Sequence, residues 1–195
     1  MVTRYLLRMT IFCLCFVSAQ SLFAQDTKTD PAAAQKAWMD YMTPGPAQKM
    51  LAEGVGEWKS KMKMWQDPSA PPMEVEGTTT NEMILGGRYL KSVTRSTMMG
   101  MPFEGWFLLG CDNISKEVTV IWYDNMGTGT MIAKGAYDKE TKTATLTGTT
   151  MEPTVGKEVP FRETFKFTDK NNQLMEYFVF KDGKEVKIME VAYSR

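Results

Sequence analysis

The sequence predicts an all-β domain, a closed antiparallel up-and-down barrel of about ten strands preceded by two short helices. From Val55 onward, charged and less polar residues alternate with a period of two, as in strands with one wet and one buried face. Turn-forming residues interrupt this pattern at short intervals. Such a meander must close, split into two sheets or leave edges exposed. We favour closure because no linker requires a Greek-key crossover, and a two-sheet sandwich is the competing architecture.

The N-terminal residues 1–24 have the pattern of a secretory signal peptide. Arg4 and Arg8 form a basic start, an uncharged apolar run follows, and small residues indicate cleavage after Ala24, with Ala19 as the second choice. The apolar run is too short to span a membrane. We therefore expect a periplasmic or secreted protein without an integral membrane span after cleavage. An uncleaved N-terminal anchor is the alternative.

Two helices are expected before the strands. Residues 25–45 form a polar tail and a first helix, for which Asp30 is a suitable N-cap and Pro31 a suitable first helical residue. A second short helix fits residues 46–53, with a glycine directly after it. The barrel domain then comprises residues 46–195.

The strands follow from the alternation and from the hairpin-forming residues between them. Pairs such as Gly86-Gly87 suit tight turns. The approximate strand ranges are 57–64, 73–84, 87–97, 103–111, 117–124, 129–137, 142–150, 159–168, 173–181 and 185–193.

Composition excludes several functions. The chain has 23 basic and 23 acidic residues, so cleavage after Ala24 would remove Arg4 and Arg8 and leave a net charge of −2. No basic stripe remains, and nucleic-acid binding is not expected. The sequence contains no histidine, which excludes imidazole zinc sites, Ser-His-Asp and Cys-His catalysis and His-ligated haem. After cleavage Cys111 is alone, and we interpret it as a small buried hydrophobe. No cofactor is predicted.

Five short motifs occur in one order along the chain, at residues 50–58, 86–90, 103–112, 120–124 and 193–195. Together they resemble the bacterial domain-of-unknown-function family 1579 (DUF1579) over about residues 46–195. The resemblance implies a lipocalin-like barrel, often in exported proteins, and no established activity or catalytic residues. The chain departs from the family pattern at Cys111, where the family usually has tyrosine.

Aromatic and methionine side chains are candidate ligand contacts. Trp58, Trp106 and Trp122 lie on predicted strands, and Met62 shares a face with Trp58. These residues would line a cavity for an apolar ligand, and ordinary barrel packing is the alternative. Asp124, at the end of its strand, either caps the following turn or contacts a ligand at the barrel rim.

Three glutamates lie on otherwise apolar strand faces. They are Glu163 with Phe165, Glu176 with Phe178, and Glu190 with Ile188. Because burying an unpaired carboxylate is costly, a buried one would have a raised pKa and could act as a general acid or base. The alternatives are a solvated barrel mouth or a structural ion pair, with Arg88 or Arg162 as partner.

Methionine is frequent, with 17 residues in the chain and three of them within residues 97–101. Thioethers suit Cu(I), but most of these methionines are scattered along strands without a ligand spacing. We predict no metal site and favour packing or a pliable cavity wall.

The predicted function is binding of a small, mostly apolar molecule inside the barrel of an exported protein. The alternatives are a carboxylate-based enzyme acting in the cavity and a non-catalytic interaction protein of the cell envelope. Because one fold serves many functions, the volume of the interior and the residues that line it must decide.

Overall fold

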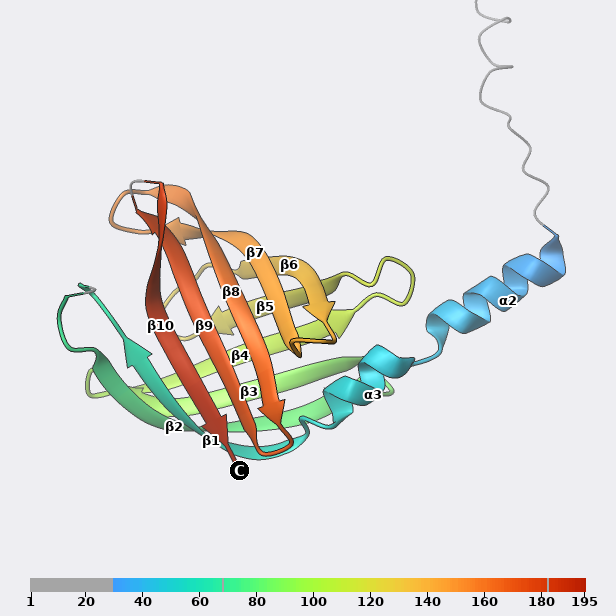
Figure 1. Ribbon diagram of the computed structural model, residues 1–195, viewed down its shortest axis with the longest axis horizontal. Coiled ribbons are helices and arrows are strands. Elements are labelled where there is room, and N and C mark those ends of the chain that lie inside the picture. Colours follow the sequence, from blue (N-terminus) through green and yellow to red (C-terminus); the bar gives the residue numbers. More distant parts are fainter. Residues whose placement is uncertain (1–29, 68, 182) are drawn as a thin grey trace, which may run out of the picture. The chain divides into compact units, whose positions relative to one another are not determined.

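A closed ten-stranded antiparallel barrel is the main feature of the computed structural model, which describes residues 30–67, 69–181 and 183–195 (Figure 1). The predicted fold class is therefore confirmed. The expected signal peptide lies outside the described residues. Two compact units are present, the helix α2 (Pro31–Met42) and the barrel unit from Thr43 to Arg195.

The helix α2 begins where the sequence predicts. The Asp30 side chain accepts a hydrogen bond from the backbone N–H of Ala32, which satisfies one of the free donors of the first turn. Lys36 and Asp40 form an ion pair one turn apart. All residues of α2 are exposed or half-buried within the described chain.

The helix α3 (Pro46–Ala52) covers one end of the barrel and packs against β2, β3 and β4. The side-chain amide of Gln48 anchors this helix through two hydrogen bonds. Its Oε1 accepts from the Gly45 backbone N–H at 2.8 Å, and its Nε2 donates to the Cys111 carbonyl at 2.7 Å. Leu51 is buried beneath it. This helix therefore closes the end at which β4 finishes.

Each strand pairs with its neighbours in sequence, and β1 pairs with β10 to close the ring (Figure 1). In the closing ladder Lys59 lies opposite Ser194 and Met64 opposite Met189. The strand bounds are β1 Gly56–Met64, β2 Met73–Ile84, β3 Tyr89–Met98, β4 Met101–Cys111, β5 Val118–Asp124, β6 Met131–Asp138, β7 Thr143–Glu152, β8 Lys157–Asp169, β9 Asn172–Lys181 and β10 Lys184–Ser194.

A β-bulge between Lys187 and Met189 shifts the in–out alternation of the β10 side chains by one residue. Both Ile188 and Met189 line the interior, and Glu190 then pairs on the outside with Lys187. The expectation that Glu190 shares an inner face with Ile188 is therefore wrong, because the inserted residue breaks the period of two.

The core packs inside the barrel. Its most buried side chains are Val120 on β5, Leu146 on β7 and Phe161 on β8. Phe161 stacks on Tyr177, with ring centroids 4.9 Å apart. Further leucine, valine and alanine side chains of this cluster complete the packing.

Arg195 ties the closing strands to the segment that enters β1. Its guanidinium donates to the carbonyls of Glu53 and Val55 at 3.0 and 2.9 Å, and its Nε donates to the Lys170 carbonyl. The same group lies 4.4 Å from the ring centroid of Trp58, which is 2% exposed.

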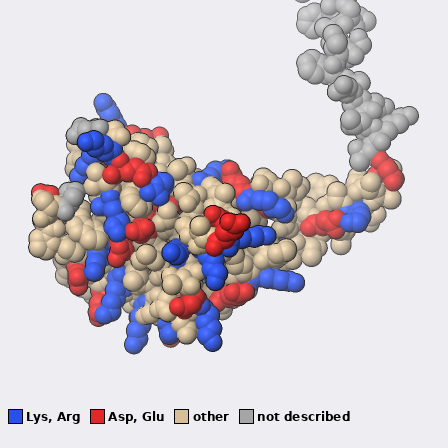
Figure 2. All heavy atoms as spheres, in the orientation of Figure 1, with Lys and Arg blue, Asp and Glu red and all other residues tan. Residues whose placement is uncertain are grey.

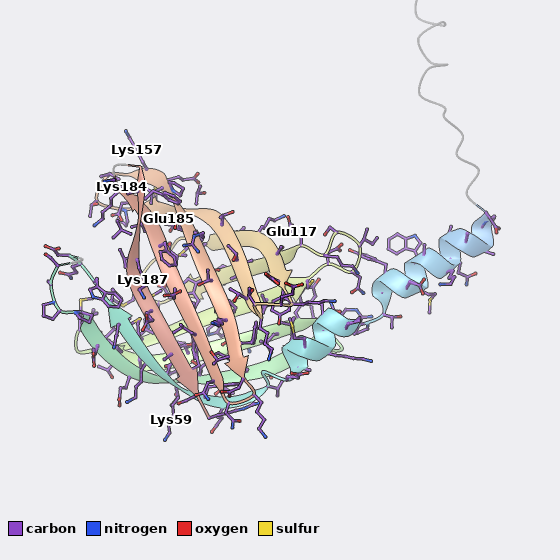
Figure 3. The ribbon with its side chains drawn as sticks, in the orientation of Figure 1. Lys59, Glu117, Lys157, Lys184, Glu185 and Lys187 are labelled. Atoms are coloured by element: carbon purple, nitrogen blue, oxygen red, sulfur yellow. The ribbon has the colours of Figure 1, made fainter. Side chains whose placement is uncertain are left out.

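The outer wall is polar and mixed in charge. The six charged side chains labelled in Figure 3 lie outside the barrel. Among them, Glu117 pairs with Lys134 on β6, and Glu185 on β10 pairs across β9 with Arg162 on β8. Acidic and basic groups intermingle on the face seen in Figure 2. Within the described chain, no helix is long and apolar enough to cross a membrane.

We expect R195K to lower the free energy of unfolding by about 1–3 kcal/mol, because lysine cannot reproduce the forked hydrogen bonds and the stacking on Trp58. Denaturant unfolding measures the change. The matched control is R95K, since Arg95 forms an exposed ion pair with Glu104. Equal effects of the two substitutions would contradict a closing role for Arg195.

Candidate functional site

The barrel encloses a cavity of about 390 Å³. It extends from Leu51 and Gly54 beside α3 to Asp124 and Met126 at the opposite end of the barrel. This volume falls within the range of small-molecule sites. The core includes side chains of α3, β3 and β4, such as Leu51, Leu90 and Leu109, as well as residues of β5 to β9, and the cavity is the part of the interior that they leave unfilled.

The cavity wall is largely apolar. Seven methionines line it: Met62, Met64, Met98, Met126, Met131, Met175 and Met189. Unbranched thioether chains adapt to irregular ligands, so this wall is pliable. The prediction that methionines pack or form a pliable cavity wall is consistent with these positions.

An aromatic cluster holds the wall formed by β4 and β5. Trp122 stacks on Phe103 at 6.3 Å and meets Phe107 edge-on at 6.4 Å between ring centroids. Phe107 in turn contacts Phe165 at 5.0 Å. The indole of Trp122 lies directly on Gly105, where a Cβ atom would approach it to 2.3 Å. The absence of a side chain at Gly105 therefore leaves room for the indole of Trp122.

A polar strip on β1, β2 and β3 continues the cavity wall beside this aromatic cluster. It comprises Ser60, Thr79, Asn81, Ser92, Thr94 and Ser96. The hydroxyls of Thr79 and Thr94 hydrogen-bond to each other at 2.9 Å. Asn81 donates from Nδ2 to the Gly54 carbonyl at 3.0 Å, and its Oδ1 is buried without a partner in the described part of the chain.

Glu163 is the buried charge of the site. It lies on β8 between Leu146 and Tyr177, lines the cavity and is 5% exposed. Its Oε1 has no hydrogen-bond partner among the described residues. Burial away from water therefore raises the pKa of its carboxyl group from 4.5 to about 7.

Two tyrosines share this environment. Tyr177 is the register partner of Glu163 on β9, and Tyr193 lies on β10. Burial first, and the nearby Glu163 second, raise the pKa of both phenols well above the usual range. Both hydroxyls consequently stay protonated wherever Glu163 titrates.

Asp124 caps the turn that follows β5. Its carboxylate accepts hydrogen bonds from the backbone N–H groups of Met126 and Gly127 and from Nε1 of Trp122, the last at 2.6 Å. Three donors thus hold this side chain at the end of the cavity.

Of the candidate ligand contacts, Met62, Trp122, Asp124, Glu163 and Phe165 line the cavity. Trp58 does not. It lies inside the barrel but is enclosed by Gly54, to whose carbonyl its Nε1 donates at 2.9 Å, and by Arg195. Its role in the structure is packing.

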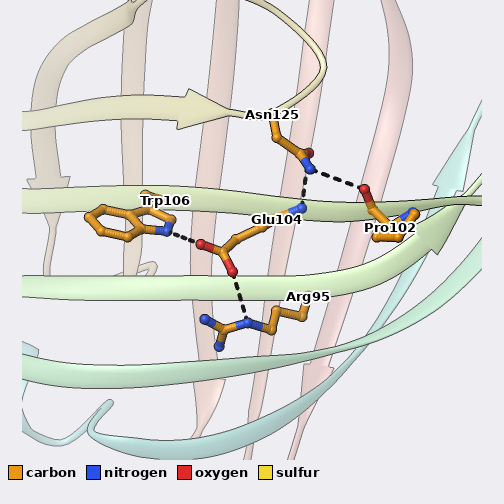
Figure 4. A network of polar contacts seen from close by, with 5 residues as sticks. All are labelled: Arg95, Pro102, Glu104, Trp106 and Asn125. Atoms are coloured by element: carbon orange, nitrogen blue, oxygen red, sulfur yellow. Dashed lines mark hydrogen bonds and ion pairs between the residues drawn. The ribbon is translucent and has the colours of Figure 1, made fainter.

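Trp106 lies on the outer wall, contrary to the expectation that it lines the cavity. It is 44% exposed and donates to Glu104, which also accepts from Arg95 (Figure 4). Asn125, directly after β5, binds β4 at two points: its Oδ1 accepts from the Glu104 backbone N–H, and its Nδ2 donates to the Pro102 carbonyl. Gly105 and Phe107 face inward on β4, so Trp106 between them must face outward.

Glu176 and Phe178 also lie on the outer wall, and their predicted places in the cavity are wrong. Lys187 pairs with Glu176 at 2.9 Å and with Glu190 at 2.7 Å. Arg162 lies over the ring of Phe178 at 4.0 Å. The alternation along β9 separates two faces correctly, but both carry aromatic side chains, and the inner one bears Met175 and Tyr177.

Sequence reasoning missed the polar strip and both tyrosines. Asn81 is in phase with Thr79 and Val75, and Tyr193 with Val191. The alternation contained this signal, but serine and threonine do not mark a strand face as buried.

Cys111 is half-buried, and burial is the main reason that its thiol pKa is raised. Among the described residues no three His, Cys, Asp or Glu gather as metal ligands.

These features define the class, a closed ten-stranded antiparallel barrel with a mostly apolar cavity in its interior. The chain belongs to DUF1579, a family of proteins of unknown function whose profile matches residues 43–195. The predicted resemblance is thereby confirmed.

One solved structure shows the same fold. The crystal structure of Rv2717c from M. tuberculosis is similar with a TM-score of 0.58 and 17% identity, covering 78% of this chain and 99% of that one. A redesigned β-barrel matches with a TM-score of 0.39 and 12% identity over 74% of this chain and 93% of its own. No curated protein matches the sequence.

We expect Glu163 to make stability depend on pH. Its pKa is higher in the folded than in the unfolded chain, so its contribution is fully present below about pH 4.5 and is lost as pH rises through about 7. The free energy of unfolding of E163Q minus that of wild type should therefore be larger at about pH 8 than at about pH 5, by about 2 kcal/mol. Denaturant unfolding at both pH values measures this change.

The control for this prediction is E176Q, which removes a carboxyl group from the outer wall. The free energy of unfolding of E176Q should change between the two pH values by the same amount as that of the wild type. A wild-type pH dependence that persists unchanged in E163Q would show that Glu163 is not buried as described.

Proposed function

We propose that this protein binds one small, largely apolar molecule inside its barrel. The observation that carries the proposal is the cavity of about 390 Å³, whose wall combines methionines, an aromatic cluster and a short polar strip. Binding sites for small molecules have this composition, with a few polar groups that fix orientation. A ligand would replace empty or poorly solvated space with contacts to the wall.

Access to the cavity supports the proposal. Met126 lines the cavity and is 42% exposed, so the space reaches the surface at the end opposite α3. Met98 and Phe103 lie at the same end, on the hairpin between β3 and β4. Flexible methionine side chains there can move aside for a ligand.

We further propose that the protein acts after export, in the periplasm or outside the cell. The basis is the signal-like pattern of residues 1–24. The proposal predicts a mature chain that begins after Ala24 or Ala19, which intact-mass measurement of protein secreted by its bacterial host would establish. A full-length mass in the cell envelope would contradict it.

Carboxylate catalysis is the second candidate, favoured by one observation: Glu163 is buried beside open volume and has a pKa of about 7. Its carboxyl group has no hydrogen-bonded partner among the described residues, whereas a general acid or base usually acts with an orienting group.

The third candidate is a non-catalytic interaction protein. A filled barrel interior would favour it, and the cavity does not match that condition. Binding is therefore the better-supported function.

Blocking the cavity should abolish binding. We expect N-phenyl-1-naphthylamine, a neutral apolar fluorophore, to bind one site and to accept energy from tryptophan. In S92F a phenyl group would occupy the cavity, since Ser92 is a small buried residue of its wall. The dissociation constant should rise at least about tenfold.

The matched control is T78F, which places the same ring on the exposed face of β2. It should bind the fluorophore as wild type does. Equal loss in both variants, or no saturable binding by wild type, would contradict the proposal.

A further inference from the structure

We infer that the ligand is an amphipathic organic cation whose protonated amine lies against Glu163, an inference that rests on the binding function proposed above. Four features of the cavity point to this class: two buried acceptors without donors, carboxylates without a counter-ion, a wall of aromatic faces and sulfur atoms, and a mostly apolar volume large enough for a hydrocarbon chain.

Within residues 30–67, 69–181 and 183–195, the two buried side-chain polar atoms without partners are both acceptors. They are Oε1 of Glu163, in a side chain 5% exposed, and Oδ1 of Asn81, in a side chain 9% exposed. The Asn81 amide cannot be turned around, because its other atom faces the Gly54 carbonyl and must be the donor Nδ2. Both residues line the cavity, so the ligand must bring hydrogen-bond donors.

The charge of the lining has one sign. Its ionisable carboxylates are Asp124 and Glu163, and no lysine or arginine is among the described residues that line it. Arg162, next to Glu163 in sequence, points outward and binds Glu185 through two hydrogen bonds of 2.7 and 2.8 Å. The described residues therefore provide Asp124 with backbone and indole donors but provide Glu163 with no cation.

The remaining wall also favours a cation. The faces of Phe103, Phe107, Trp122 and Phe165 carry the negative side of the ring quadrupole. An anion would meet these faces and two carboxylates without any compensating positive group. A carboxylate ligand such as a fatty acid is consequently disfavoured, although the cavity has room for its chain.

Proton balance gives the inference a pH signature. An ammonium ligand pairs with the ionised carboxylate, so binding below the pKa of Glu163 releases its proton to solvent. The titratable groups facing Glu163 are Tyr177 on β9 and Tyr193 on β10, which stay neutral. Asp124, at the end of the cavity opposite α3, already accepts three hydrogen bonds. Affinity for the amine should thus rise from about pH 5.5 to about pH 8.

The experiment compares three ligands with one chain length: decylamine, decanol and decanoate. Each competes with N-phenyl-1-naphthylamine on wild type, E163Q and E176Q, whose bound fluorophore also reports that each variant is folded. In wild type at about pH 8, decylamine should bind at least about tenfold more tightly than decanol, and decanoate most weakly. In E163Q this preference should fall to within about threefold, whereas E176Q should keep it.

The two proposals fail separately. If the fluorophore and decanol bind, but decylamine has no advantage or E163Q keeps the advantage, cation selection is overturned and the binding barrel stands. If decanoate binds most tightly and its affinity falls as pH rises, Glu163 acts as a neutral donor, which also overturns the inference. If wild type binds neither the fluorophore nor any of the three ligands, the binding function itself is overturned.

Discussion

The pairing of β1 with β10 is the constraint on which the rest of the structure depends. It removes both edges of a ten-stranded sheet and gives every strand an inner and an outer face. Arg195 and Trp58 hold this seam where the closing strands meet the segment after α3. Once the ring is closed, its circumference exceeds what the core side chains fill, and the cavity is the remaining space.

The fold could be predicted because its signals are local. Alternation marked every strand to within a few residues, and Asp30-Pro31 marked the start of α2. The site could be predicted only in part. Period two distinguishes two faces but not the inner from the outer when both are apolar, as the positions of Trp106 and Phe178 show. The bulge after Lys187 could not be read from the pattern at all, since one inserted residue leaves composition unchanged.

Glu163 illustrates how a site differs from a core. Phe161 and Phe165 on the same strand face provide ordinary burial, whereas a carboxyl between them is costly to ionise. On the outer wall, Glu176 and Glu190 share one lysine and stay in contact with water. The unfavourable placement of Glu163 is the kind of local inconsistency that a ligand of opposite charge would resolve.

The central claim is that the closed barrel keeps an accessible cavity lined by methionines. Methionine-methyl NMR of the protein with and without N-phenyl-1-naphthylamine tests it most directly. The account predicts large, saturable shifts for Met62, Met175 and Met189, which line the cavity, and none for the exposed Met39 and Met151. Shifts confined to the exposed methionines, or no shifts at all, would contradict it.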